Sequence, residues 1–235
     1  MKKILTASFL LFISIQAMAA RPFVTDDARL TTEESCQLES WTRIYPDRHE
    51  LWTLPACNPS GNLEFTMGAG YQRDTQGPSA GTESYDYVFQ LKTLFRPLKT
   101  NDWGFGLAAG TVRHPSISPG PNALGNRYAY LPLSISFNDD KLIVHTNLGW
   151  MKDKASARSN TTWGVGGEFM LTPRVIAIAE TYGDDRRAVY QHLGGRFWVV
   201  PERVQIDATM GRQLNAPAAG RWFSLGLRLT PDHLF

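Results

Sequence analysis

Ionisable side chains recur at alternate positions between apolar residues, a spacing that places them together on one face of extended strands. The set contains both signs, and buried charges must be paired or hydrated. It therefore predicts either a packed internal ion-pair network or the wall of a hydrated pore. Glu64 is expected to pair with Lys92 or Arg96. Asp207 is expected to pair with Arg196 or Arg228. The predicted lumen-lining residues are Glu64, Lys92, Arg96, Glu168, Glu180, His192, Arg196, Asp207 and Arg228.

The motifs of common catalytic sites are missing from the sequence. No Gly-x-Ser-x-Gly turn occurs, and the five histidines show no close spacing typical of metal ligands. Residues 104–110, Gly-Phe-Gly-Leu-Ala-Ala-Gly, are not followed by the helix N-terminus that a dinucleotide site needs. His145 and His192 are expected to face the interior, but nothing marks a serine activated by either. The sequence predicts no catalytic residue, no metal and no cofactor.

The elements that must position these side chains are β-strands. Aromatic and β-branched residues alternate with polar ones between clusters of Gly, Pro, Asn and Asp, and no long segment shows a helical period. In one segment, for example, Tyr87 and Phe89 alternate with Asp86 and Gln90. The predicted strands lie near 36–45, 50–57, 62–72, 84–96, 104–112, 126–137, 142–151, 160–171, 175–182, 188–200, 204–211 and 221–230.

The connections between these strands alternate in length. Residues 73–83 and 114–125 form long links, whereas 97–103 and 138–141 are short, and the first hairpin near 46–49 breaks the pattern. Outer-membrane barrels have short periplasmic turns and longer external loops, a rhythm that a soluble sandwich does not require. The predicted fold class is therefore all-β, a transmembrane antiparallel β-barrel of about 12 strands with both termini periplasmic.

Composition excludes several other classes. The chain of 235 residues carries 24 basic and 22 acidic side chains, and two of the basic ones, Lys2 and Lys3, lie in a segment without acids. The balanced remainder argues against nucleic-acid binding. With 43% hydrophobic residues and a mean hydropathy of -0.26, the chain is too apolar for disorder and too polar for a helical membrane protein.

The N-terminus is typical of an export signal. Two lysines, an apolar run over 4–15 and the small residues 17–20 predict a secretory signal peptide over residues 1–20. Residues 21–35 are polar and show no strand pattern, so they are expected either to fold into the lumen as a plug or to remain in the periplasm. The barrel itself is expected over 36–235, in the outer membrane of a Gram-negative bacterium after cleavage of the signal.

Two further features fit a barrel exported to an oxidising compartment. Cys36 starts the first predicted strand and Cys57 ends the second, so both lie at one end of a hairpin and are expected to form a disulfide. The last strand carries alternating apolar residues and the chain ends in an aromatic one, which resembles the signal that the barrel assembly machinery recognises. The predicted assembly signal comprises Phe223, Leu225, Leu227, Leu229 and Phe235.

Several segments resemble one family of proteobacterial outer-membrane proteins. They are Arg-Pro-Phe-Val-Thr-Asp-Asp-Ala-Arg at 21–29, Cys-Gln-Leu-Glu at 36–39, Leu-Pro-Ala-Cys-Asn-Pro at 54–59, Lys-Thr-Leu-Phe-Arg-Pro at 92–97 and Arg-Val-Gln-Ile-Asp-Ala-Thr at 203–209. The chain is similar along nearly its whole mature length to the phenol-degradation meta-pathway outer-membrane family. This resemblance implies an outer-membrane barrel and small aromatic solutes, and it assigns no catalytic residue.

The function predicted from these observations is a narrow outer-membrane channel for uptake of small solutes. Two alternatives remain at this point, a plugged barrel with a structural or surface-interaction role and a lipid hydrolase sited on the barrel wall. The expected partners are outer-membrane lipid and lipopolysaccharide, the barrel assembly machinery and small solutes, and no nucleic acid is expected.

Overall fold

The computed structural model describes residues 23–115, 124–154, 156–185, 189–214, 220–231 and 234. Within these residues the chain forms twelve strands, all close to the predicted segments. They are β1 (Ser35–Ile44), β2 (Arg48–Asn58), β3 (Glu64–Asp74), β4 (Glu83–Arg96), β5 (Trp103–Arg113), β6 (Asn126–Phe137), β7 (Leu142–Lys152), β8 (Ser159–Thr172), β9 (Val175–Asp184), β10 (Tyr190–Val200), β11 (Val204–Gln213) and β12 (Arg221–Leu229).

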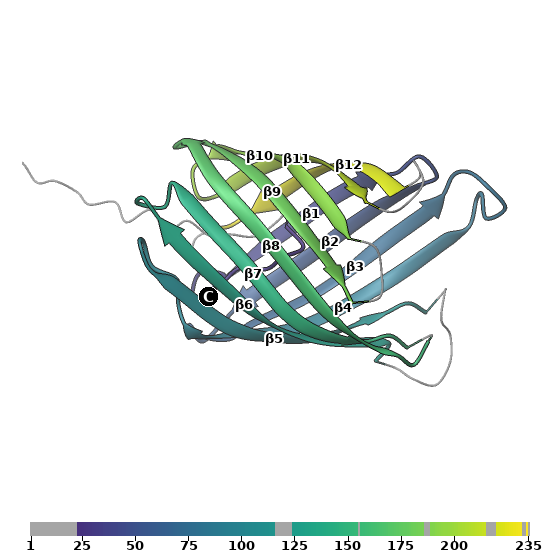
Figure 1. Ribbon diagram of the computed structural model, residues 1–235, viewed down its shortest axis with the longest axis horizontal. Helices are drawn as coiled ribbons and strands as arrows, with labels where there is room; N and C mark the ends of the chain where they lie inside the picture. The colour runs from purple at the N-terminus through teal and green to yellow at the C-terminus, as the bar shows by residue number, and fades with distance from the viewer. Residues whose placement is uncertain are drawn as a thin grey trace, which may run out of the picture.

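Each strand pairs antiparallel with the next along the chain, and β12 pairs with β1 to close the sheet into a barrel (Figure 1). At this seam Leu38 lies opposite Leu229 and Ile44 lies opposite Phe223. The predicted fold class, an all-β antiparallel barrel of twelve strands, is confirmed. Among the residues that the structure describes, no helix is long and apolar enough to cross a membrane.

The two ends of the barrel differ in their connections. One end, here called the short-turn end, carries the links 59–63, 97–102, 138–141, 173–174 and 201–203. The other, the loop end, carries 75–82, 114–125, 153–158, 185–189 and 214–220, together with the short first link 45–47. The predicted alternation is thus confirmed, including its exception in the first hairpin. Near the C-terminus the Leu234 amide donates to the Glu34 carbonyl at 2.9 Å, so the barrel begins and ends at the short-turn end.

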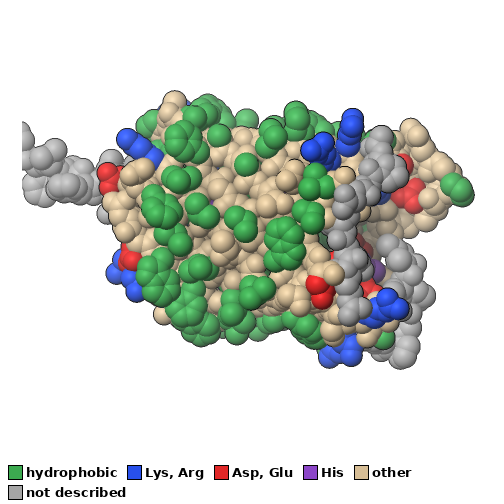
Figure 2. Space-filling view, viewed as in Figure 1, with side chains coloured by type: hydrophobic (Ala, Val, Ile, Leu, Met, Phe, Trp, Pro, Cys, Tyr) green, Lys and Arg blue, Asp and Glu red, His purple; other side chains and the backbone are tan. Residues whose placement is uncertain are grey.

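The outer wall is apolar. Side chains that point away from the lumen on alternate positions leave large hydrophobic groups exposed, such as Met67, Phe95, Leu148 and Leu193. Figure 2 shows apolar side chains spread over the wall, with charged ones gathered near the two ends of the barrel. The opposite faces of the same strands carry the buried polar and charged residues. This inversion of the usual globular pattern is what a bilayer requires of a barrel.

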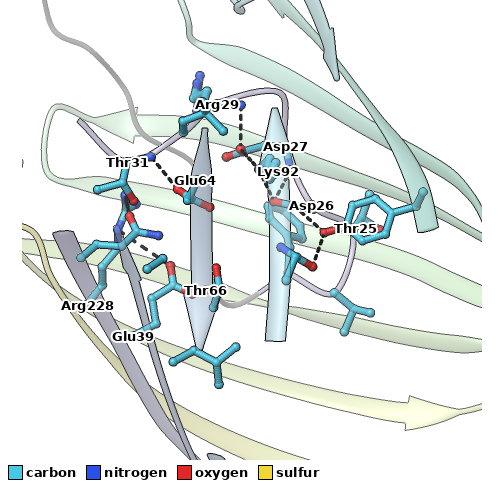
Figure 3. A pocket seen from close by; sticks show the side chains of 18 of the residues that line it. Thr25, Asp26, Asp27, Arg29, Thr31, Glu39, Glu64, Thr66, Lys92 and Arg228 are labelled. Carbon is cyan, nitrogen blue, oxygen red and sulfur yellow. Dashed lines mark hydrogen bonds and ion pairs between the residues drawn. The ribbon is translucent and has the colours of Figure 1, made fainter. Parts of the chain in front are cut away.

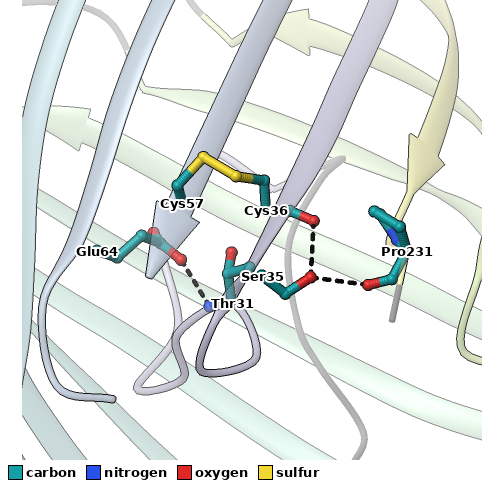
Figure 4. Close-up of a disulfide and its surroundings, with 6 residues drawn as sticks. All are labelled: Thr31, Ser35, Cys36, Cys57, Glu64 and Pro231. Carbon is teal, nitrogen blue, oxygen red and sulfur yellow. Dashed lines mark hydrogen bonds between the residues drawn. A yellow bond between two sulfur atoms is a disulfide. The ribbon is translucent and has the colours of Figure 1, made fainter. Parts of the chain in front are cut away.

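The first hairpin is joined covalently. Cys36 and Cys57 lie directly opposite each other in the β1–β2 register and form a disulfide, with their Cα atoms 4.0 Å apart (Figure 4). The predicted pairing is confirmed. Next to it, the Ser35 hydroxyl donates to the Pro231 carbonyl at 2.8 Å, so the start of β1 is held both to β2 and to the segment that follows β12.

Candidate functional site

Residues 23–31, here called the plug, lie inside the barrel rather than outside it. Two consecutive carboxylates, Asp26 and Asp27, contact the ammonium of Lys92 on β4 at 2.8 and 3.4 Å. The hydroxyl of Tyr130 on β6 donates to the second oxygen of Asp26 at 2.7 Å. Because Lys92 is only 3% exposed, these contacts form a buried ionic cluster. The sequence left the position of this segment open, and the structure places it in the lumen.

The backbone of the plug is held by side chains from strands around the barrel. Glu180 on β9 accepts hydrogen bonds from the amides of Val24, at 3.0 Å, and of Thr25. Glu64 on β3 accepts from the Thr31 amide at 2.6 Å, a contact visible in Figure 4. These bonds satisfy amide groups that a buried irregular segment would otherwise leave unpaired, an arrangement that favours a fixed plug.

Two glycines of β8 make room for the plug. A Cβ atom added at Gly164 would overlap the Thr25 Oγ1, and one at Gly166 would lie 2.9 Å from the Phe23 ring. Both glycines face the lumen, and both positions therefore favour the absence of a side chain. The wall of β8 is shaped to receive the plug.

A directional chain of hydrogen bonds lies beneath the plug. The Ala28 amide donates to Ser134 Oγ at 2.9 Å, so the Ser134 hydroxyl can donate to His145 Nδ1, which lies 2.8 Å away. His145 Nε2 lies 3.2 Å from Glu168 Oε1, and the Arg196 guanidinium contacts the same oxygen at 2.6 Å. Ser134 and His145 have no exposed surface, so this chain forms part of the packed interior.

A second cluster lies on the first and last strands. The Arg228 guanidinium on β12 donates to Gln37 at 2.8 Å and lies 3.9 Å from Glu39, both on β1. On the neighbouring pair of strands, Asp207 lies directly opposite Arg196 in the β10–β11 register. The seam of the barrel is therefore closed by interior polar contacts as well as by its backbone ladder.

The structure brings together most of the predicted lumen residues but not Arg96. A bulge between Leu94 and Arg96 shifts the register of β4 against β5, so the side chain that strict alternation would turn inward points elsewhere. Arg96 lies 2.8 Å from Asp102 in the short turn and stacks over Trp103. Its assignment to the lumen is corrected. The predicted residues that are buried in the interior are Glu64, Lys92, Glu168, Glu180, His192, Arg196, Asp207 and Arg228.

Some predicted ion-pair partners are replaced in the structure by residues that the sequence did not single out. Lys92 lies opposite Glu64 in register, but its ammonium forms ion pairs with Asp26 and Asp27 of the plug. The link between Ser134 and His145 was also missed, although the turn over 138–141 sets these residues directly opposite each other. Counting outward from that turn would have found the pair, whereas no pattern in the sequence indicated the contacts of the plug.

The remaining predicted residues lie on the outer wall or outside the described part of the chain. Phe223, Leu225 and Leu227 expose 38 to 48% of their surface on β12, next to Leu229 at the end of the strand. Phe235 and residues 1–22, which include the predicted signal peptide, lie outside the described residues. Among the described residues, no cluster of three His, Cys, Asp or Glu side chains could hold a metal ion.

Two cavities adjoin the plug. One, of about 190 Å³, lies between the plug and strands β1–β4, β6 and β12, and Figure 3 looks into it. The other, of about 320 Å³, is lined by Val24 and Thr25 and by residues toward the loop end of the barrel, including Tyr128, Tyr182 and Tyr190. The plug therefore narrows the lumen and leaves space on more than one side.

Electrostatics differ between the plug and the turns. Burial raises the pKa of the Asp27 carboxyl above its ordinary value, and the nearby Lys92 ammonium acts in the opposite direction. In the exposed turn, the hydrogen bond from Arg96 holds the pKa of the Asp102 carboxyl below its usual range. A carboxylate in the lumen is thus costly to keep charged, whereas one in the turn is easily ionised.

Comparisons with known proteins identify one family model and several solved structures with the same fold. The family model described as "Uncharacterised conserved protein UCP029691" matches residues 8–230. The comparison with curated proteins gave no match.

Several solved structures share the fold. The KdgM porin in complex with disordered oligogalacturonate has a TM-score of 0.63 at 8% identity, over 83% of this chain and 99% of that one. The COG4313 outer membrane channel from Pseudomonas putida F1 has a TM-score of 0.57 at 11% identity, over 89% and 98%. The NanC porin has a TM-score of 0.55 at 10% identity, over 83% and 98%. At these identities the likeness shows the fold alone.

Proposed function

The chain belongs to the family described as Uncharacterised conserved protein UCP029691, and we propose that it forms a narrow outer-membrane channel for small solutes. The observation that carries this proposal is a closed barrel with an apolar outer wall and a charged interior. An apolar outer wall suits contact with lipid, and a charged interior suits a path for solutes. The porins and channels among the similar solved structures support the same function.

The orientation of the channel follows from its two ends. Bacterial barrels have short periplasmic turns and longer external loops, so the short-turn end faces the periplasm in this proposal. Both termini of the barrel then lie on the periplasmic side, where a chain exported behind a cleaved signal peptide over residues 1–20 would deliver them. Lipopolysaccharide would surround the external half, and the barrel assembly machinery would act on the C-terminal strand.

The plug sets the size of the solute, and the cavity on its loop-end side suggests a class. Tyr182 and Tyr190 stack with ring centres 5.2 Å apart, and Tyr128 and Tyr130 stack at 6.1 Å. All four line the cavity of about 320 Å³ together with Trp163. Aromatic faces favour planar solutes. This lining supports uptake of small aromatic compounds, the class that resemblance to the phenol-degradation family implies.

Conductance in planar bilayers tests the channel. The purified protein should pass a small, steady current, and a variant lacking residues 23–31 should pass a larger one because the plug no longer narrows the lumen. A protein that is silent in both forms, although folded, would contradict the channel and favour the structural barrel. A silent natural protein with a conducting deletion variant would identify the plug as a complete barrier.

One observation keeps the hydrolase as a second candidate. Ser134, His145 and Glu168 make contacts in the same order as the triad of serine hydrolases. The serine hydroxyl contacts the imidazole, and the imidazole contacts the carboxylate. However, Ser134 is fully buried and already accepts the Ala28 amide, so a substrate could reach it only if the plug moved away. We propose that the protein is not an enzyme. Lipid hydrolysis that disappears in Ser134→Ala would overturn this.

A further inference from the structure

The cavity of about 190 Å³ beside the plug is lined by charges that do not balance. Its carboxylates are Asp26, Asp27, Glu39 and Glu64, and its cations are Arg29, Lys92 and Arg228. The lining thus carries one more negative than positive group. In a space with little water, an excess charge favours an oppositely charged guest. The composition of the lining therefore favours a cationic guest.

The distribution of these charges localises the excess. Arg228 lies on the far side of the cavity near Glu39, with its guanidinium hydrogen-bonded to Gln37. On the near side the Lys92 ammonium is shared by Asp26 and Asp27, and Glu64 lies opposite Lys92 in the β3–β4 register. Figure 3 shows the side chains of Asp27, Glu64 and Lys92 together on this side of the space. With Arg29, which Figure 3 shows beside Asp27, three carboxylates and two cations thus line this side of the cavity.

Two buried oxygen atoms on this side lack a hydrogen-bond partner. Asp27 is 3% exposed, and its Oδ2 has no partner among the described residues. Thr31 is 2% exposed, and its Oγ1 also has none. Buried polar atoms without partners are rare in proteins and indicate a missing water, ion or ligand. The ionised Asp27 carboxylate can only accept a hydrogen bond, and the Thr31 hydroxyl can accept or donate one, so a hydrogen-bond donor can satisfy both atoms.

Part of the remaining lining is apolar. Leu30 of the plug and Leu54, Ala56 and Trp41 of the wall bound the same cavity. At about 190 Å³ it is smaller than the roughly 300 Å³ of sites for drug-sized ligands. An ammonium group has three donors and no acceptor, and a short hydrocarbon chain attached to it would fit the apolar part.

From this geometry we propose that the cavity between the plug and β1–β4 is a binding site for small primary ammonium compounds. The ammonium lies against Asp27 and Thr31, and the hydrocarbon part packs on Leu54 and Ala56. This inference adds a second solute class to the aromatic compounds proposed for the loop-end cavity, and it rests on the proposed channel for its role in transport. Its test therefore measures binding rather than current.

The experiment uses the purified full-length barrel in detergent and isothermal titration calorimetry with butylammonium, butyrate and butanol. Butylammonium should bind, whereas the anion and the neutral alcohol of the same length should not. In Asp27→Asn, butylammonium binding should weaken at least about tenfold because the charge-assisted hydrogen bond is lost. Glu202→Gln, which removes an exposed carboxylate in a short turn, should bind like the natural protein.

A second variant keeps the test decisive if Asp27→Asn does not fold. Ala56→Leu leaves every charge in place and fills the cavity, so it should weaken butylammonium binding while keeping the gel mobility of the folded barrel. The proposal is overturned if the natural protein does not bind butylammonium, if butyrate binds equally well, or if folded Asp27→Asn or Ala56→Leu binds as tightly as the natural protein. A barrel that binds the amine but passes no current would contradict the channel and leave the site intact.

Discussion

Lys92 joins the plug to the wall of the barrel. Its ammonium is buried and contacts two carboxylates of the plug. Strict alternation placed Lys92 and Arg96 on the same face of β4, and it was right for the first and wrong for the second. The difference is the bulge after Leu94, a local change of register that hydrophobic periodicity does not reveal.

Charge reversal at these two positions gives a matched pair of variants. In Lys92→Glu, the carboxylates of Asp26 and Asp27 would face another carboxylate in place of the ammonium, and breaking such a buried pair costs about 3–5 kcal/mol. We expect a reduced yield of folded barrel, measured as heat-modifiable gel mobility. In Arg96→Glu, an exposed pair worth about 0–1 kcal/mol is lost, so the yield should hardly change.

The opposite result would reveal a hydrated lumen. If Lys92→Glu folds well and its reversal potential in the bilayer shifts toward cations, the ammonium faces water rather than a dry network. The near-complete burial of Lys92 and Arg196 favours the network.

At the scale of elements, the strands could be predicted and the plug could not. A strand that separates lipid from lumen must alternate, so a period of two marks each of the twelve. Residues 23–31 form no element with a period, and their position depends on contacts with strands distant in sequence, such as Glu64 on β3 and Glu180 on β9. The register of neighbouring strands is easier to predict than the plug and harder than the strands, because it can be counted outward from a short turn.

Adjacent glycines of β8 test how tightly the plug fits. Gly166 faces the lumen, and a Cβ there would lie 2.9 Å from the Phe23 ring, whereas the nearest atom to a Cβ at Gly167 is 4.0 Å away. We expect Gly166→Val to displace the plug and raise single-channel conductance, and Gly167→Val to leave it unchanged. Equal conductance in the two variants would mean that Phe23 does not limit the passage.

The disulfide should stabilise the first hairpin measurably. Cys36 and Cys57 are separated by 21 positions, and closing a loop of this length contributes about 3 kcal/mol in the chain-entropy model. A Cys36→Ser, Cys57→Ser double variant should therefore unfold at a lower urea concentration than the oxidised protein. Reduced natural protein is the control and should behave like the variant. Rapid thiol labelling of the unreduced natural protein would contradict the bond.

For the whole molecule, the C-terminal strand is the expected recognition element during assembly. Its apolar residues Phe223, Leu225 and Leu227 face outward on β12, as the predicted assembly signal requires. Deleting Phe235 should lower the amount of protein in the outer-membrane fraction, measured by fractionation and immunoblotting. Phe169→Ala removes an exposed aromatic group of the wall elsewhere and should have a smaller effect. Equal amounts in both variants would assign recognition to another segment.

Because β1 pairs with β12, the barrel can close only when the whole chain is present. Leu38 meets Leu229 across this seam, so the first strand made is completed only by the last. Until then both strands present unpaired backbone groups, which readily join other chains. A chain that stops early, through a nonsense mutation or proteolysis, would thus give no smaller pore. The truncated chain would form an open sheet that is prone to aggregation, and the cell would have to degrade it.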